Sequence, residues 1–228
     1  NILFNNSANE SAYFIFKRLN FKPIYKKTYN SYCFFMTNPK LNKNYTFRSF
    51  FNNVFLQASY NYQKTTFKKE ASKHKIISIS KSTELYDGLW DRTKENFQIK
   101  VKRTSKIINW IKGSNKKREI ISIGKIDDSG LVTSFLFIRY SYKLLCIDIW
   151  GKLDLSILKA ILFKVHNMYN LFIEIPCYNK IINKELSHLN FVQKINKKDI
   201  RLVKFPNELK KLNDDDSFFT LLEGDYIM

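Results

Sequence analysis

Glycine is scarce in this sequence, which has six glycines among 228 residues. No two of them are close enough to form a G-x-G-x-x-G turn or a G-x-x-x-x-G-K-[ST] loop. Both motifs need closely spaced glycines, because backbone N–H groups must approach a phosphate without an intervening Cβ atom. The sequence therefore excludes a nucleotide-binding loop of either kind.

Cysteine and histidine are also scarce, with three residues of each type scattered along the chain. An odd number of distant cysteines indicates reduced thiols in a cytoplasmic protein, since a disulfide framework would need pairs. No C-x-x-C or H-E-x-x-H motif is present. The sequence therefore predicts that the protein has no metal site.

Long apolar runs are missing as well. The longest ones, such as Leu131–Ile138, are well short of the roughly 18 residues that cross a bilayer, so no membrane span is expected. The N-terminus lacks the basic stretch and apolar core of a signal peptide. Because the chain begins at Asn1 and not at methionine, we expect it to be a fragment of a longer protein.

Positive charge, by contrast, is abundant. The formal net charge is +19, which attracts phosphates of nucleic acid, anionic membrane or a cofactor. The basic, aromatic stretch from Tyr45 to Lys75 is the best candidate for nucleic-acid binding, although no recognised nucleic-acid motif is present. An AT-rich coding sequence is an alternative explanation of the charge, since Lys, Asn, Ile, Phe and Tyr are all common.

The first part of the chain predicts a short strand, a helix and a hairpin. Apolar residues recur at helical spacing in Glu10–Leu19, after the apolar segment Ile2–Phe4. Two β-prone stretches, Phe21–Lys27 and Ser31–Thr37, are separated by Thr28–Asn30, which is typical of a hairpin. A polar loop and a connecting helix within Thr46–Lys69 are expected to follow.

From Lys75 the pattern alternates between strands and helices. We expect a hairpin turn at Asp127–Gly130 and a crossover helix at Asp154–Tyr169, between strands Leu144–Trp150 and Leu171–Ile175. A crossover of this length requires the two strands to be parallel. The other predicted elements are strand Ile76–Ile79, helix Thr83–Asn96, helix Ser105–Lys112 with Gly113 as a left-handed cap, strands Arg118–Ile126 and Leu131–Tyr140, helix Lys180–Leu189, and a closing strand pair, Phe191–Ile195 with Ile200–Phe205.

A weak internal repeat joins the two parts. The tripeptide L-N-F ends both Arg18–Phe21 and His188–Phe191, and each copy follows a predicted helix. The segment Asn9–Phe21 resembles the motif N-x-x-A-x-x-x-Y-x-x-x-G-F of the GCN5-related N-acetyltransferase superfamily. Asn9, Ala12 and Phe21 match that motif, whereas Phe16 stands in place of its tyrosine and Asn20 in place of its glycine.

The second part, from about Lys75 to Met228, is similar to a further acetyltransferase unit, as in bacterial proteins that carry two such units in tandem. The features that carry this similarity are Tyr86–Trp90, the run from Arg103 to Trp110, His188–Phe191 and Glu223–Asp225. The resemblance implies a mixed α/β fold with a mostly antiparallel sheet, helices on both faces and a tandem arrangement. It implies a C-terminal remnant of a first unit at residues 1–37, a linker at 38–74 and a second unit at 75–228.

The resemblance also implies an acyl-CoA-dependent N-acyltransferase, with acetyl-CoA or another acyl-CoA as cosubstrate and a small-molecule or protein amine as acceptor. Asn9, Gly151 and Lys152 would contact the cofactor. The family's pyrophosphate loop, Q/R-x-x-G-x-G/A, has only one glycine here, at Gly151 before the crossover helix. Gly151 and Lys152 also fit a simple strand-to-helix turn.

Charged residues inside apolar strands provide the catalytic candidates. Asp148 and Glu174 either line a wet cleft as a general base for the amine or form ion pairs with Lys or Arg. Alternation along the strand places Cys146, Asp148 and Trp150 on one face. Tyr178 is a candidate acid for the departing thiolate, and Phe16 has no proton to donate.

Three hypotheses follow from these patterns. The protein is an N-acyltransferase and this chain is a poor catalyst in isolation, because the pyrophosphate loop and the tyrosine of the motif are both missing. Alternatively, the chain is a non-enzymatic, basic nucleic-acid-binding module. Finally, the second unit is a structural partner that covers the cleft of the first.

Overall fold

The structure is a computed structural model and describes residues 3–5, 18, 22–34, 58, 61–79, 84–96, 102–114, 118–177, 180–189 and 193–204. Its strands are β1 (Leu3–Asn5), β2 (Lys22–Phe34), β3 (Lys75–Ser78), β4 (Ile120–Asp127), β5 (Gly130–Arg139), β6 (Lys143–Gly151), β7 (Phe172–Cys177) and β8 (Gln193–Lys204). Its labelled helices are α3 (Leu85–Thr93), α4 (Ser105–Ser114), α5 (Leu155–Tyr169) and α6 (Lys180–Ser187), and a short 3-10 turn, η2 (Lys94–Asn96), follows α3. A further helix covers residues 61–71, within and just beyond the predicted connecting helix.

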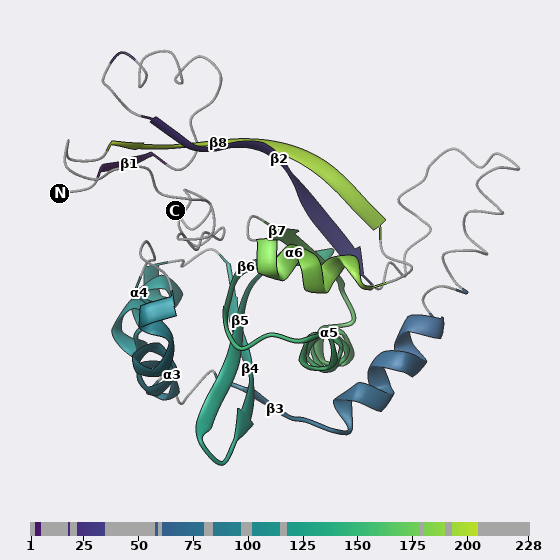
Figure 1. Cartoon of the computed structure of the whole chain (residues 1–228). Helices are drawn as coiled ribbons and strands as arrows, with labels where there is room; N and C mark the ends of the chain where they lie inside the picture. The colour runs from purple at the N-terminus through teal and green to yellow at the C-terminus, as the bar shows by residue number, and fades with distance from the viewer. Residues whose placement is uncertain are drawn as a thin grey trace, which may run out of the picture.

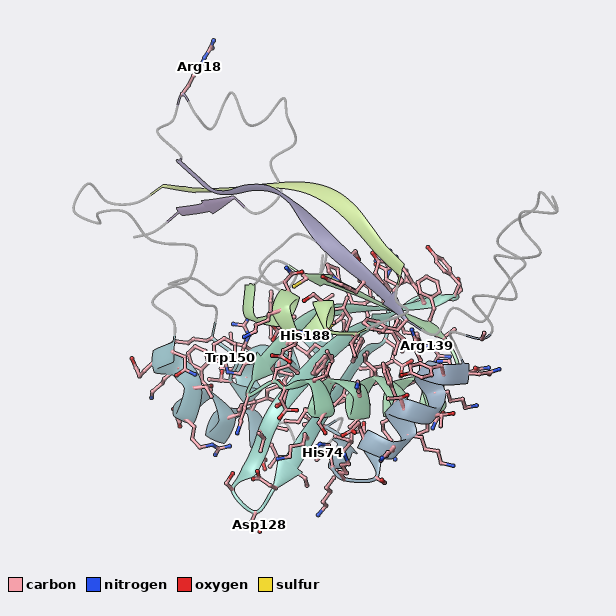
Figure 2. All side chains as sticks on the ribbon, turned by 45° about the vertical axis from the view of Figure 1, so that its right-hand side comes forward. Arg18, His74, Asp128, Arg139, Trp150 and His188 are labelled. Atoms are coloured by element: carbon pink, nitrogen blue, oxygen red, sulfur yellow. The ribbon has the colours of Figure 1, made fainter. Side chains whose placement is uncertain are left out.

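The described strands form one sheet in the order β1-β8-β2-β7-β6-β5-β4-β3. All neighbouring pairs are antiparallel except β6 and β7, which are parallel and joined through α5. The predicted crossover is therefore confirmed. The hairpin between β4 and β5 is confirmed too, since Asp127 pairs with Gly130 and the labelled Asp128 lies at its tip (Figure 2). Gly130 adopts φ +101°, a conformation that suits glycine at a tight turn.

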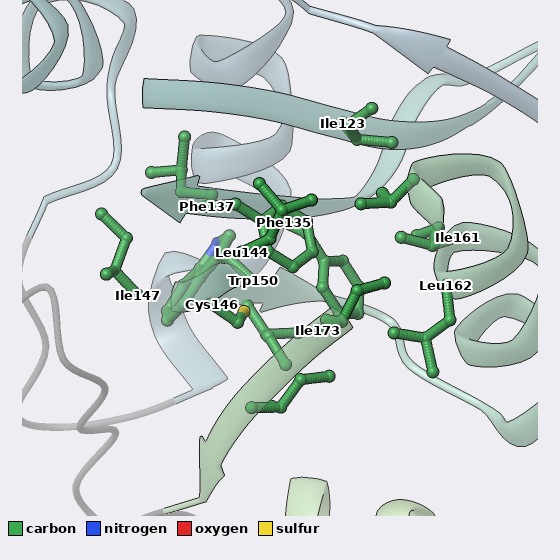
Figure 3. Close-up of a cluster of buried hydrophobic side chains, with 14 of the residues drawn as sticks. Ile123, Phe135, Phe137, Leu144, Cys146, Ile147, Trp150, Ile161, Leu162 and Ile173 are labelled. Atoms are coloured by element: carbon green, nitrogen blue, oxygen red, sulfur yellow. The ribbon is translucent and has the colours of Figure 1, made fainter. Parts of the chain in front are cut away.

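Helices cover both faces of this sheet (Figure 1). α3 and α4 lie on one side, whereas α5 and the helix over residues 61–71 lie on the other. Between the sheet and α5 is a close-packed apolar core, in which Phe135 and Phe137 stack with ring centroids 6.0 Å apart (Figure 3). Ile161 and Leu162 of α5 belong to this core and are fully buried. The mixed, mostly antiparallel α/β fold is thus confirmed.

β2 and β8 differ from the sequence prediction, because each is a single long strand. The hairpin expected at Thr28–Asn30 is wrong, and so is the closing strand pair expected between Phe191 and Phe205. The polar residues that indicated turns lie opposite each other in the ladder, where Thr28 pairs with Lys198 and Asn30 with Asn196. Continuous pairing satisfies the backbone N–H and C=O groups of both strands, which overrides the weak local turn preference.

The predicted division into units remains a prediction. β2 comes from the segment assigned to the first unit, and it lies between β7 and β8 of the second. It pairs antiparallel with β8 over most of its length and with β7 over Asn30–Phe34. A single sheet therefore receives strands from both sides of the predicted linker. The helix predicted at Glu10–Leu19 lies outside the described residues, apart from position 18.

Two helix ends also differ from expectation. Gly113 lies inside α4 and is not among the residues with positive φ, so it is not the predicted left-handed cap. The predicted helix Thr83–Asn96 is shorter, because α3 ends at Thr93 and η2 follows it. α5 instead ends on Asn170, which adopts φ 50° and is the left-handed cap of that helix.

His166, in the last turn of α5, gives the fold a pH dependence. Its Nδ1 donates to the carbonyl oxygen of Leu171 (3.1 Å), and the side chain is buried. Burial lowers the pKa of His166, so folding favours the neutral imidazole. A lowered folded-state pKa means that this stabilisation is present above the unfolded pKa of about 6.5 and is lost as pH falls below it.

We therefore expect the free energy of unfolding to decrease between pH 7 and pH 5 more steeply in the native chain than in His166→Gln. Urea denaturation at a series of pH values measures this difference. His188→Gln is the matched control, since His188 is exposed. Equal slopes for the native chain and His166→Gln would contradict the prediction.

Candidate active site

Asp148, the first catalytic candidate, is buried in β6 and bound to an arginine. Both of its carboxylate oxygens accept from Arg103, at 2.8–3.1 Å from Nε and Nη2. The two side chains are 2% and 0% exposed. A charge is costly to bury alone, and this two-point geometry neutralises both groups. Of the two environments that the sequence left open for Asp148, the structure has the ion pair.

Aromatic rings pack around this ion pair. The Arg103 guanidinium lies 4.3 Å from the centroid of the Trp150 ring. Trp150 in turn contacts Trp90 of α3, with centroids 5.6 Å apart, and its Nε1 donates to Thr93 Oγ1 at 2.7 Å. The labelled Trp150 lies on the α3 and α4 side of the sheet (Figure 2). We call Arg103, Asp148, Trp150, Trp90 and Thr93 the Arg103 cluster, and it connects both helices to β6.

The expected alignment of three residues on one face of β6 is wrong for Cys146. Asp148 pairs with Leu136, whereas Cys146 pairs with Phe137, so the two residues lie on opposite faces. The cause is a β-bulge at this register shift, which places an extra residue, Ile147, in β6. Burial raises the pKa of the Cys146 thiol well above its ordinary value, which keeps it protonated and unsuited to nucleophilic attack.

Glu174, the second catalytic candidate, is also buried and bound. Its Oε1 accepts from Ser31 Oγ at 2.8 Å, and its Oε2 accepts from Lys143 Nζ at 2.6 Å. Burial acts to lower the pKa of Lys143, but the hydrogen bond and charge of Glu174 outweigh it, and the pKa is raised. Glu174 is therefore also in an ion pair, and β2 supplies one of its donors through Ser31.

The parallel ladder between β6 and β7 is short. It comprises the pairs Lys143 with Phe172, Leu144 with Ile173, and Leu145 with Glu174. The ladder does not continue along the rest of β6, from Cys146 to Gly151. The bulge at Ile147 follows directly after the end of this ladder. β6 and β7 are therefore paired at one end only, and Asp148 lies just beyond the last pair.

Gly151 and Lys152, the cofactor candidates, lie where β6 ends. Gly151 adopts φ +101°, and a Cβ atom there would overlap the carbonyl oxygen of Val132 in β5. The Lys152 N–H donates to the same oxygen at 3.1 Å, and the Lys152 carbonyl accepts from Thr133 Oγ1. The requirement for glycine is thus explained by the close approach of β5, while the Lys152 side chain is exposed.

The N-terminus of α5 is where the family resemblance predicts that an acyl-CoA pyrophosphate binds, and it already has acidic partners. Asp154 is the N-cap, and its Oδ1 accepts from the Ile157 N–H at 2.8 Å. In the first turn, Ser156 Oγ donates to Glu70 Oε2 at 2.6 Å and contacts His74 Nε2 at 2.7 Å. The Glu70 carboxylate is paired with Lys73, whereas the Asp154 carboxylate opposes a further anion at the positive end of the helix dipole. The residues of this helix end do not fit a pyrophosphate.

Two of the six predicted site residues, Asn9 and Tyr178, lie outside the described residues, and so does Phe16. The structure places Asp148, Gly151 and Lys152 on or directly after β6, and Glu174 on the adjacent β7. The sequence prediction missed the partners Arg103, Lys143 and Ser31. An ion pair with Lys or Arg was one of two environments predicted for each carboxylate, but the sequence offered no way to choose among 39 such residues.

Metal sites, membrane-spanning helices and disulfides are absent from the described ranges. No group of three or more His, Cys, Asp or Glu side chains there could hold a metal ion. No helix in that part of the chain is long and apolar enough to span a membrane. The three cysteines are buried, and none forms a disulfide.

Comparison with known proteins identifies the fold. No protein-family model and no curated protein matches the chain. Among solved structures, it is similar to a GCN5-related N-acetyltransferase from Anabaena variabilis, with a TM-score of 0.53, 9% identity, and coverage of 89% of this chain and 45% of that one. It is also similar to a GCN5-related N-acetyltransferase from Kribbella flavida, with a TM-score of 0.50, 10% identity, and coverage of 89% and 42%.

The chain therefore has the GCN5-related N-acetyltransferase fold, as its sequence motifs predicted. It spans less than half the length of both structural neighbours.

Proposed function

We propose that the chain is part of an acyl-CoA-dependent N-acyltransferase, which transfers an acyl group from a thioester to the amine of a small molecule or a protein. The observation that carries this proposal is the fold, shared with two N-acetyltransferases across 89% of the chain.

In this proposal the described unit is a poor catalyst by itself. A general base has to accept a proton from the attacking amine, which requires a carboxylate with a free lone pair near the amine. Asp148 uses both oxygens to bind Arg103, and Glu174 binds Ser31 and Lys143. Protonating either carboxylate would weaken a buried ion pair and leave its cation poorly compensated. Their proposed role is to hold β6 and β7 against the rest of the sheet.

The acyl-CoA is proposed to bind elsewhere than at the N-terminus of α5. Asp154 and Glu70 support this part of the proposal, because their carboxylates lie at the helix end. The chain spans only 45% and 42% of its structural neighbours, so an acyl-CoA site in another unit of the protein is compatible with their size. The described unit would then support that other unit.

Titration calorimetry with acetyl-CoA tests the proposal directly. We expect the 228-residue chain to bind acetyl-CoA with a Kd above about 1 mM, which corresponds to about 4 kcal/mol of binding free energy. Lys152→Glu and the matched control Lys164→Glu, at an exposed site in the third turn of α5, are both expected to leave the heat signal unchanged.

Two outcomes would contradict the proposal. Micromolar binding that Lys152→Glu abolishes and Lys164→Glu retains would locate the cofactor at α5, against our assignment. If acetyl-CoA binds neither this chain nor a longer gene product that contains it, the acyltransferase function itself is wrong. Chromatographic detection of CoA released in the presence of primary amines distinguishes binding from transfer.

A further inference from the structure

The helix over residues 61–71 has one buried side and one strongly basic side. Gln63 and Phe67 are buried at 3% exposure each, four residues apart and therefore on one face of the helix. Lys64, Lys68 and Lys69 are all exposed. The helix therefore packs against the rest of the protein through the face that carries Gln63 and Phe67, while its three lysines are exposed to solvent.

This helix lies on the same side of the sheet as α5, opposite α3 and α4 (Figure 1). Near its C-terminal end, Glu70 accepts from Ser156 in the first turn of α5. Near its N-terminal end, the positive charge of Lys64 acts on His166 in the last turn of α5. A hydrogen bond near one end and a charge interaction near the other therefore place the two helices next to each other.

Together these helices form a surface that we call the two-helix basic face. Its cations are Lys64, Lys68 and Lys69 of the first helix, Lys73 just after it, and Lys159 of α5. The only carboxylate on the helix over residues 61–71 is Glu70, which already binds Lys73 Nζ at 2.9 Å and Ser156. α5 itself contains no acidic residue. The face therefore keeps a large excess of positive charge.

We propose that the two-helix basic face binds the phosphate backbone of nucleic acid without reading its sequence. Lys64 and Lys68 are one helical turn apart, roughly 6 Å, which is close to the spacing of successive phosphates on one strand. All of the cations on the face are lysines, which bind phosphates as point charges and lack the forked geometry that reads guanine.

Anionic membrane is a poorer match for this face. Insertion into a bilayer requires exposed apolar side chains along the same helix side. On the helix over residues 61–71, the exposed positions besides the lysines are Asn61, Tyr62 and Thr65. Only Tyr62, at 57% exposure, could enter the interface, and one ring is a weak anchor.

Fluorescence anisotropy with a labelled 20-bp DNA duplex of mixed sequence tests this inference. We expect binding at 50 mM salt, with an affinity that decreases steeply as salt increases. Lys68→Gln combined with Lys69→Gln removes two phosphate contacts. This variant should weaken binding by about tenfold and lower the slope of log affinity against log salt by about 2.

The matched control is Lys102→Gln combined with Lys106→Gln. It removes the same charge from exposed positions at and before α4, on the opposite face of the sheet. We expect its affinity to remain within about twofold of the native chain. Circular dichroism spectra that match the native chain will show that both variants are folded.

Three results would overturn the inference. The first is no binding to the duplex at 50 mM salt. The second is an equal loss of affinity in the two double variants, which would mean that charge acts globally. The third is tighter binding to vesicles with 30% phosphatidylserine than to the duplex, lost in Lys68→Gln/Lys69→Gln, which would assign the face to a membrane. None of these results depends on acyl-CoA binding, so the proposed function is tested separately.

Discussion

Replacing Arg103 with methionine is expected to lower the free energy of unfolding by about 3–5 kcal/mol, because it leaves the buried Asp148 carboxylate without its cation. A domain of this size has about 5–15 kcal/mol of stability in total, so this loss is severe. Methionine keeps an unbranched apolar side chain beside Trp150, where the Arg103 guanidinium lies 4.3 Å from the ring centroid. Urea denaturation followed by tryptophan fluorescence measures the change.

Two further variants show whether the effect comes from the unpaired charge. Arg139→Met breaks the ion pair with Glu119, in which both side chains are about half exposed, and should cost only about 0–1 kcal/mol. Arg103→Met combined with Asp148→Leu removes both charges and should recover most of the loss. If Arg103→Met costs no more than Arg139→Met, Asp148 is not held as a buried ion pair, and its candidacy as a general base is strengthened.

Substituting Gly151 with alanine is expected to lower the free energy of unfolding by about 2–6 kcal/mol. The residue adopts φ +101°, where a side chain adds about 1–3 kcal/mol of backbone strain. The new methyl group would also overlap the Val132 carbonyl oxygen, and overpacking of this kind adds about 1–3 kcal/mol. The shift in the urea midpoint, at constant m value, gives the change in stability.

Gly113→Ala is the control for this substitution. A Cβ atom at Gly113 has no other heavy atom within 4 Å, and the residue is helical. Alanine should therefore stabilise α4 by about 0.5–1 kcal/mol. A Gly151→Ala variant as stable as the native chain would show that the glycine is not needed for the approach of β5. A cofactor role would then be the better explanation of that glycine.

The sequence predicted the middle of the sheet well because its signals there are local. The turn residues Asp127–Gly130 force a hairpin, and the apolar stripe of Asp154–Tyr169 requires a helix between two strands. Because a connection of that length, through a helix, joins parallel neighbouring strands, the sequence predicted parallel pairing, and β6 and β7 confirm it. Hairpin geometry and helix periodicity depend only on residues within one short window.

Predictions failed where pairing over long distances decides the structure. Polar residues in the middle of β2 and β8 resemble turns when each strand is considered alone, yet they pair across the sheet. The β-bulge in β6 moved Cys146 to the other face from Asp148, and no residue in that strand signals a bulge. An extra residue in a strand is stabilised by its neighbours in the sheet, so strict alternation could not reveal it.

For the candidate site, the sequence predicted that Asp148 and Glu174 lie either at a wet cleft or in ion pairs, because a carboxylate inside an apolar strand is costly to bury unpaired. The folded structure selects the ion pairs and their partners. Arg103 reaches Asp148 from the start of α4, 45 residues away, and Ser31 reaches Glu174 across 143 residues. The burial penalty is a property of one residue and its strand, whereas the choice among many lysines and arginines depends on which segments the folded chain brings within about 3 Å.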